Sequence, residues 1–116
     1  MRVIDGEQVL VRIFIGESDR WQHQSAHLAL IERLRKEGFA GATVFRGVSG
    51  FGARSILHTA NILRLSEDLP IVIEVVDTQA HADRLLGIFD EMQVEGLVTM
   101  EKVRVLKYAP APSAAR

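Results

Sequence analysis

The residues best suited to bind an anion lie in a glycine-rich stretch near the middle of the chain. Gly47, Gly50 and Gly52 place three glycines within six positions, and Arg46 and Arg54 flank them. Backbone N–H groups freed by glycine can surround a phosphate or carboxylate, and a guanidinium can pair with the same anion. The order G-x-x-G-x-G, with no helix start behind it, is not the dinucleotide-binding fingerprint. A plain mobile loop is the alternative interpretation.

A dense polar set follows this stretch, with Ser55, His58 and Asn61 close to Arg54. It could bind an effector or a protein partner. Ser55 with His58 as its base is the catalytic alternative, but their spacing does not secure the geometry and no orienting carboxylate is indicated. Hydrogen bonds from His58 and Asn61 that fix the loop are the structural alternative. We expect no catalytic residue and a protein that is not an enzyme.

The histidines outside this set suggest no metal site. His23 and His27 have the spacing of one helical turn, which can hold a metal, with Gln24 where a zinc protease carries its glutamate. Because no third ligand is evident, we expect an exposed polar pair, and we interpret His81 in the same way. The chain has no cysteine, which excludes disulfides and thiolate ligands. We therefore expect no metal and no required cofactor.

Charged residues interrupt the apolar strands predicted in the second half of the chain. Glu74 lies in the most apolar segment, and Lys102 and Arg104 lie in the last strand. A cross-strand or intersubunit ion pair is the simpler interpretation, because buried charges need partners. The alternative is that Lys102 or Arg104 lines an effector cleft between subunits.

The composition is that of a globular protein. The chain has 116 residues, of which 47% are hydrophobic and 25% charged, and a formal net charge of −1. We expect one domain over residues 1–108 and a disordered, proline- and alanine-rich tail over 109–116. The charge balance argues against nucleic acid as a partner. No signal peptide and no apolar run of ~20 residues is evident, so we expect a cytoplasmic protein that does not insert into membranes.

Hydrophobic periodicity predicts the elements that must position these residues. In chain order they are a strand over 8–15, a helix over 21–37, a strand over 42–46, a strand over 71–76, a helix over 82–92 and a strand over 98–108. Thr78 is the expected cap of the second helix. The strand over 71–76 is nearly all β-branched and is expected to be central. Residues 53–65 fit either a helix or a strand.

This order, βαββαβ, predicts an α+β fold of the ferredoxin-like, split βαβ type. Two helices then cover one face of a four-stranded antiparallel sheet and leave the other face open. The first strand is apolar on both faces, with Leu10 and Phe14 on one and the row from Val9 to Ile15 on the other. Exposed apolar area of this size is typical of an association surface, and we expect a symmetric oligomer.

Three segments carry a resemblance to a known family. They are GFGARSILHT over residues 50–59, ILRLSEDLPIVIE over 62–74 and EGLVT over 95–99. The chain resembles, over roughly residues 5–108, a bacterial and archaeal family of uncharacterised PII-like proteins. The resemblance implies a homotrimer that binds adenine nucleotides or other small effectors in clefts between subunits. It also implies a long loop that contacts a target, often a transporter. Family members are often encoded near fluoride-channel genes, which suggests a role in ion homeostasis.

Mapped onto this chain, the resemblance places the target-contacting loop at residues 47–68 and the turn below the effector cleft at 93–99. PII proteins have a longer glycine-rich turn with a lysine there, whereas this turn keeps Gly96 and Thr99 and has no lysine before Lys102. The resemblance makes an adenine nucleotide a candidate effector, although the departure in this turn removes the lysine that binds phosphate in PII proteins. The effector-binding candidates are Arg46, Gly47, Ser49, Gly50, Gly52, Gly96, Thr99, Lys102 and Arg104. The target-contact candidates are Phe51, Arg54, Ser55, His58 and Asn61.

The leading hypothesis is therefore a PII-like signal-transduction regulator whose partners are its own copies and a membrane transporter or ion channel. The alternatives are a small-molecule enzyme that uses His58 and a trimeric adaptor that binds no ligand.

Overall fold

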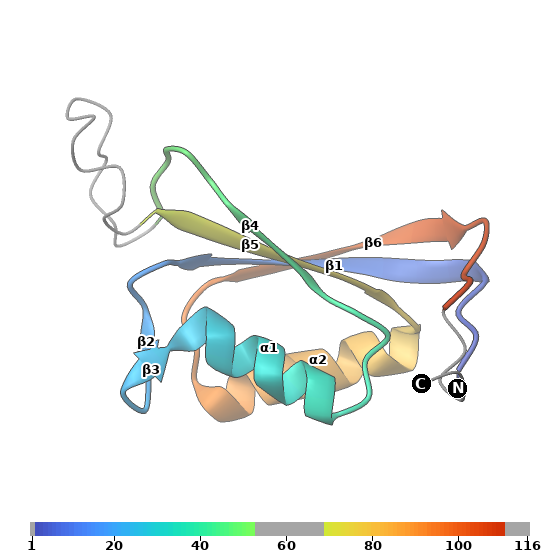
Figure 1. Cartoon of the computed structure of the whole chain (residues 1–116), viewed down its shortest axis with the longest axis horizontal. Coiled ribbons are helices and arrows are strands. Elements are labelled where there is room, and N and C mark those ends of the chain that lie inside the picture. Colours follow the sequence, from blue (N-terminus) through green and yellow to red (C-terminus); the bar gives the residue numbers. More distant parts are fainter. Residues whose placement is uncertain (1, 53–68, 111–116) are drawn as a thin grey trace.

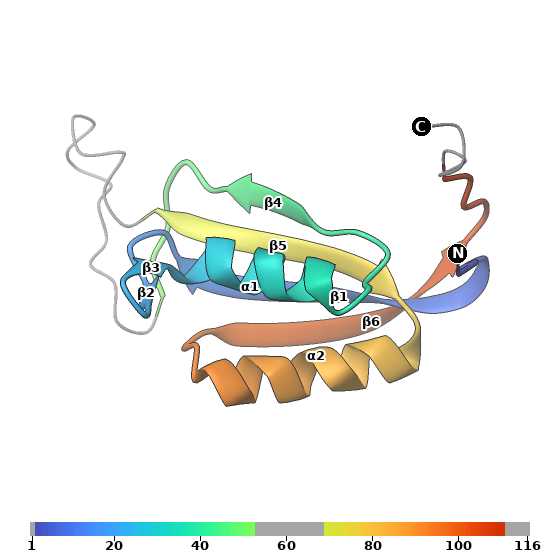
Figure 2. The same ribbon diagram turned by 60° about the horizontal axis from the view of Figure 1, so that its bottom comes forward.

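The structure is a computed structural model that describes residues 2–52 and 69–110. Its main sheet has four strands in the order β4-β5-β1-β6, and two helices cover one face of it (Figures 1 and 2). The strands of this sheet are β1 (Gly6–Gly16), β4 (Thr43–Arg46), β5 (Pro70–Asp77) and β6 (Leu97–Val105). The helices are α1 (Ala26–Lys36) and α2 (Gln79–Met92), and a small hairpin is formed by β2 (Arg20–Trp21) and β3 (Gln24–Ser25).

All neighbouring strands of the main sheet are antiparallel. In β1, Ile13 lies opposite Ile73 of β5 on one side and Val98 of β6 on the other, while Phe45 of β4 lies opposite Val72 of β5. The predicted α+β fold with a ferredoxin-like arrangement is confirmed. The prediction that the β-branched strand is central is also confirmed, because β5 pairs on both sides.

The core lies between the sheet and the two helices. Alternation in β1 and β5 directs one row of each strand toward the helices, and these rows are buried. Leu30 and Leu34 of α1 and Leu85 of α2 pack against them and are at most 1% exposed. Of the two faces that the first strand offered, the row from Val9 to Ile15 is therefore the one that meets the helices.

The predicted helix over 21–37 begins later than expected. Residues 20–25 form a hairpin instead, in which Gln22 and His23 have positive φ angles of 47° and 70°. This left-handed backbone suits a two-residue hairpin turn, and the reversal lets Trp21 pack against the core. The predicted helical pairing of His23 with His27 is thus wrong, because His23 lies in the hairpin turn.

The second helix has the predicted cap. The Thr78 hydroxyl accepts a hydrogen bond from the backbone N–H of His81 at 3.1 Å, which satisfies a donor of the first turn. His81 is half-buried, contrary to its interpretation as a surface residue. Its Nδ1 lies 3.0 Å from the Thr78 hydroxyl, and its ring packs edge-on against Phe39. No helix within residues 2–52 and 69–110 has the length and apolarity needed to span a bilayer.

Candidate functional site

The described part of the predicted target-contacting loop, residues 47–52, starts at one end of the sheet. There β4 ends at Arg46, and the Gly47 N–H donates to the Pro70 carbonyl at 2.8 Å. The Glu17 N–H donates to the Leu69 carbonyl at 2.8 Å, just after β1 ends. These bonds join the end of β1, both ends of residues 47–68 and the start of β5. They fix the two points at which residues 47–68 leave and rejoin the sheet.

Arg46, the predicted partner of an anion, already pairs with a carboxylate of the same chain. Its guanidinium contacts the Glu17 carboxylate, although 61% of the Arg46 side chain is exposed. The N–H of Gly47 is likewise engaged. Ser49 and Gly52 are exposed, and Gly50 has a φ of 145° that favours glycine. An anion at this end would have to compete with Glu17 for Arg46.

Gly96 has a structural reason to be glycine. A Cβ at this position would lie 2.5 Å from the carbonyl oxygen of Phe14 and 2.7 Å from Cγ2 of Ile15. The backbone that leads into β6 therefore passes against β1 more closely than any side chain allows. Thr99, the other predicted residue of this turn, lies within β6 opposite Arg12 and is exposed.

Gly96→Ala should lower the free energy of unfolding by about 1–3 kcal/mol, because a methyl group there must displace backbone. The matched control is Gly87→Ala, since Gly87 lies in α2 with nothing near its missing Cβ. That change should raise the free energy of unfolding by about 0.5–1 kcal/mol. Urea unfolding at one protein concentration measures both. A Gly96→Ala variant as stable as the parent would contradict the close approach.

The glycine-rich stretch that starts at Gly47 and the single Gly96 lie on opposite edges of the same sheet end. Gly47 follows edge strand β4 and Gly96 precedes edge strand β6, with β5 and β1 between them. Three strand spacings separate these edges, roughly 14 Å. Lys102 and Arg104 lie farther along β6, on the sheet face opposite to that of Thr99. A single chain therefore does not gather the predicted effector residues around one small anion.

Most of the predicted target-contact residues lie outside the described part of the chain. Arg54, Ser55, His58 and Asn61 belong to residues 53–68, and the end of the predicted tail belongs to 111–116. The ambiguous segment over 53–65 lies there as well. Phe51 is described, and 70% of it is exposed.

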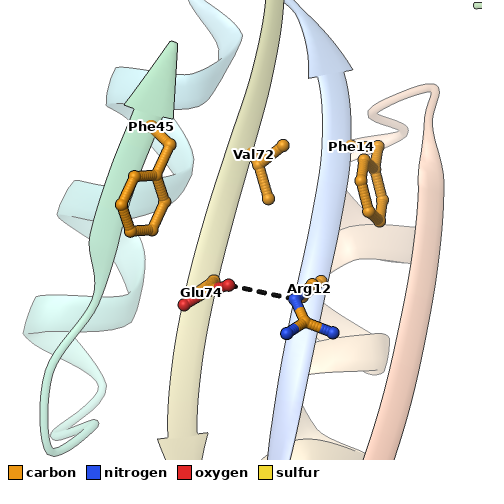
Figure 3. Close-up of a pocket in the computed structure, with 5 residues that line it drawn as sticks. All are labelled: Arg12, Phe14, Phe45, Val72 and Glu74. Carbon is orange, nitrogen blue, oxygen red and sulfur yellow. Dashed lines mark hydrogen bonds and ion pairs between the residues drawn. The ribbon is translucent and has the colours of Figure 1, made fainter. Parts of the chain in front are cut away.

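The face of the sheet away from the helices, here called the open face, carries an ion cluster that the sequence analysis missed. Arg12 donates from Nε to the Glu74 carboxylate at 2.9 Å (Figure 3). It also donates from Nη1 to the Glu101 carboxylate at 2.6 Å. These hydrogen bonds, that to Glu74 foremost, raise the pKa of Arg12 and keep it charged. Glu74 thus has the expected cross-strand ion pair, but its partner within the chain is Arg12, since Lys102 and Arg104 lie on the other face of β6. Alternation alone placed Arg12 between Leu10 and Phe14, but its partners depend on the register.

Apolar side chains surround this Arg12–Glu74–Glu101 triad. Phe14, Phe45 and Leu97 are 36%, 50% and 59% exposed on the open face. Part of the face is a shallow hollow of about 500 Å³, lined by Arg12, Phe14, Phe45, Val72 and Glu74 (Figure 3). No described element covers this face, because both helices lie on the other side (Figure 1).

A buried carboxylate organises the opposite end of the sheet. Asp77, 2% exposed, accepts hydrogen bonds from Arg2 at 2.8 and 3.0 Å, from the Ala40 N–H at 2.9 Å and from the Thr78 N–H at 2.7 Å. Burial opposes ionisation, but these bonds outweigh it and lower the pKa of Asp77. The carboxylate joins the N-terminal segment, the connection from α1 to β4 and the start of α2. Within the described residues, no group of three or more ligating side chains could hold a metal ion.

A family model and two relatives of known sequence assign this chain to the same family. The family model described as DUF190, "Uncharacterized ACR, COG1993", matches residues 8–105. A UPF0166 protein of Aquifex aeolicus is 32% identical, with 91% of this chain and 98% of that protein covered. A UPF0166 protein of Methanocaldococcus jannaschii is 30% identical, with coverage of 84% and 91%.

Solved structures resemble this fold over most of its length. CPII bound to ADP and bicarbonate, from Thiomonas intermedia, has a TM-score of 0.61 at 19% identity and covers 87% of this chain and 90% of its own. A candidate PII-like signaling protein from Thermus thermophilus has a TM-score of 0.61 at 21% identity, with coverage of 91% and 94%. At these identities the likeness establishes a PII-like fold.

Proposed function

This chain belongs to the DUF190 family, and from that premise we propose that it is a PII-like regulatory protein. It forms a homotrimer through the open face and binds a small anionic effector between subunits. The effector acts by binding, and the protein has no catalytic step. Residues 1–108 form the regulatory domain, and 109–116 are its tail.

The observation that carries the proposal is the placement of the glycine-rich stretch at Gly47 and of the turn at Gly96 on opposite edges of one sheet end. Within a chain these edges are roughly 14 Å apart. In a closed ring of copies, one edge of each subunit meets the other edge of its neighbour. The glycine-rich stretch of one subunit then faces the Gly96 turn of the next, and both contact a single ligand.

An adenine nucleotide is the effector that we propose. CPII, which shares this fold, has been solved bound to ADP and bicarbonate and also bound to ADP, AMP and acetate. In this chain the phosphate would meet the Arg46 guanidinium. Lys102 and Arg104 of the neighbouring subunit lie farther along β6 and would line the part of the cleft away from the phosphate. Because Arg46 pairs with Glu17, the anion must displace that carboxylate.

The partner of the regulator is proposed to contact the loop at 47–68. Phe51 and Val48, whose side chains are 70% and 82% exposed, are described residues of this loop that offer apolar contacts. Following the family resemblance, we propose that the protein is cytoplasmic and that its target is a membrane transporter or ion channel.

Calorimetric titration of the full chain with ATP, ADP, AMP and cyclic AMP tests the effector. We expect binding heat with at least one of them. Arg46→Gln should weaken that binding about tenfold or more, because a charge-assisted hydrogen bond contributes about 1.5–3 kcal/mol. Arg35→Gln is the matched control, since Arg35 is exposed on α1 away from this end, and should bind like the parent.

Absence of heat and of a thermal shift with every nucleotide would remove the nucleotide from the proposal. A trimer that then captures its target regardless of metabolites would be the ligand-free adaptor. Equal affinities of the Arg46→Gln variant and the parent would remove Arg46 from the site.

A further inference from the structure

The open face carries an unbalanced charge. The four strands direct three titratable side chains away from the helices, namely those of Arg12, Glu74 and Glu101. The remaining side chains of this face from all four strands are those of Gln8, Leu10, Phe14, Thr43, Phe45, Pro70, Val72, Val76, Leu97, Thr99, Val103 and Val105. One guanidinium thus faces two carboxylates, and the face has a net charge of −1.

Water solvates this charge while the open face is exposed. The side chains of Arg12, Glu74 and Glu101 are 37%, 32% and 57% exposed. A carboxylate that loses its water must gain a cation or a proton, because an unpaired buried charge is costly. Arg12 already donates to both carboxylates and has no second charge to offer.

A second copy is the occupant that this face favours. A face that every copy leaves open can be covered on every copy at once when identical chains close into a symmetric ring. The relative from Aquifex aeolicus is matched over 98% of its length, so it has almost no chain outside the region that it shares with this protein. The copy, however, brings the same three ionisable groups and the same net charge. Lys102 and Arg104 cannot compensate across the interface, since they lie on the other face of β6.

We propose that closing the open face on copies of the chain takes up protons at the Arg12–Glu74–Glu101 triad, so that self-association strengthens in mild acid. This inference rests on the self-association proposed above. Protonation of one carboxyl per triad leaves Arg12 paired with the remaining carboxylate and makes the face neutral. The neutral carboxyl can still accept a hydrogen bond from Arg12 through its carbonyl oxygen.

Sedimentation velocity of the full chain from pH 5.5 to 8, at constant ionic strength, tests the inference. One proton per contact changes each association constant by up to about tenfold per pH unit. Glu101→Gln keeps the shape of the side chain and removes the surplus charge. This variant should associate more tightly than the parent at pH 8 and should show little dependence on pH.

Two features of the sedimentation experiment show whether the triad or other titrating groups cause the pH dependence. Glu32→Gln on the exposed face of α1 is the matched control and should follow the parent at every pH. The histidines titrate in the same range, but the Glu101→Gln variant keeps all of them. A pH dependence that survives in this variant would therefore belong to other groups and would overturn the inference.

The outcomes also distinguish this inference from the proposed function. A parent protein that associates equally at every pH would refute the proton uptake and leave the self-association intact. A parent protein that is monomeric from pH 5.5 to 8 would refute both. A folded Glu101→Gln variant that no longer associates would show that the second carboxylate attracts rather than repels the partner, which also overturns the inference.

Discussion

Asp77→Ala is expected to lower the free energy of unfolding at pH 7 by about 3 kcal/mol, because it leaves buried N–H groups without an acceptor. Asp77 is 2% exposed, and the N–H groups of Ala40 and Thr78 both donate to it. The variant also removes the carboxylate that Arg2 pairs with and leaves Arg2 only its hydrogen bond to the Gly38 carbonyl, which weakens the hold on the N-terminal segment. Urea unfolding at fixed protein concentration measures the loss.

The effect of this substitution should depend on pH in a defined direction. The folded pKa of Asp77 is lowered, so its ionised form stabilises the fold above the unfolded pKa of about 3.9. That contribution disappears as the pH falls through the lower, folded pKa. The stability difference between parent and variant should therefore be largest at neutral pH and should shrink in acid.

Asp90→Ala is the control for Asp77→Ala. Asp90 is exposed on α2, and its side chain lies outside the Asp77 cluster. Its replacement should change the free energy of unfolding by no more than about 0.5 kcal/mol. If the two variants were equally stable at pH 7, the assignment of Asp77 as an organising residue would be wrong.

Phe14→Glu is expected to convert the proposed trimer into a monomer. Phe14 lines the hollow on the open face and is 36% exposed in the single chain. A carboxylate there would lose its water on association and add to a face that already carries a net negative charge. Light scattering after size exclusion measures the mass, and circular dichroism checks that the variant is folded.

Leu86→Glu provides the comparison for Phe14→Glu. Leu86 is 45% exposed, but it lies on α2, on the side of the sheet away from the open face. The same gain of charge at this position should leave the trimer intact. A Phe14→Glu trimer as stable as the parent would show that the subunits meet elsewhere.

Much of the fold could be predicted because local signals agreed with the tertiary packing. The β-branched run before Asp77 marked β5, and Thr78 with the apolar stripe of α2 marked the second helix. The hairpin at 20–25 could not be predicted, since its residues are compatible with a helix. The turn at Gln22 and His23 and the packing of Trp21 outweigh that helix propensity. Tertiary contacts there decide between two local structures.

The candidate site was less accessible to sequence reasoning. The glycine motif marks the end of the sheet at which residues 47–68 leave and rejoin it, but spacing does not reveal that Gly96 is needed for its contact with β1. The triad could not be predicted, because alternation gives a residue its face but not its neighbours on other strands. Only the register places Arg12 between Glu74 and Glu101.

The mass of the purified parent protein in solution tests the central claim most directly, because both the proposed effector site and the proposed proton uptake at the triad require subunits that meet. At a protein concentration high enough to complete the association at either pH, light scattering at neutral and mildly acidic pH should give three times the mass of one chain. A protein with the mass of one chain under both conditions would contradict the account.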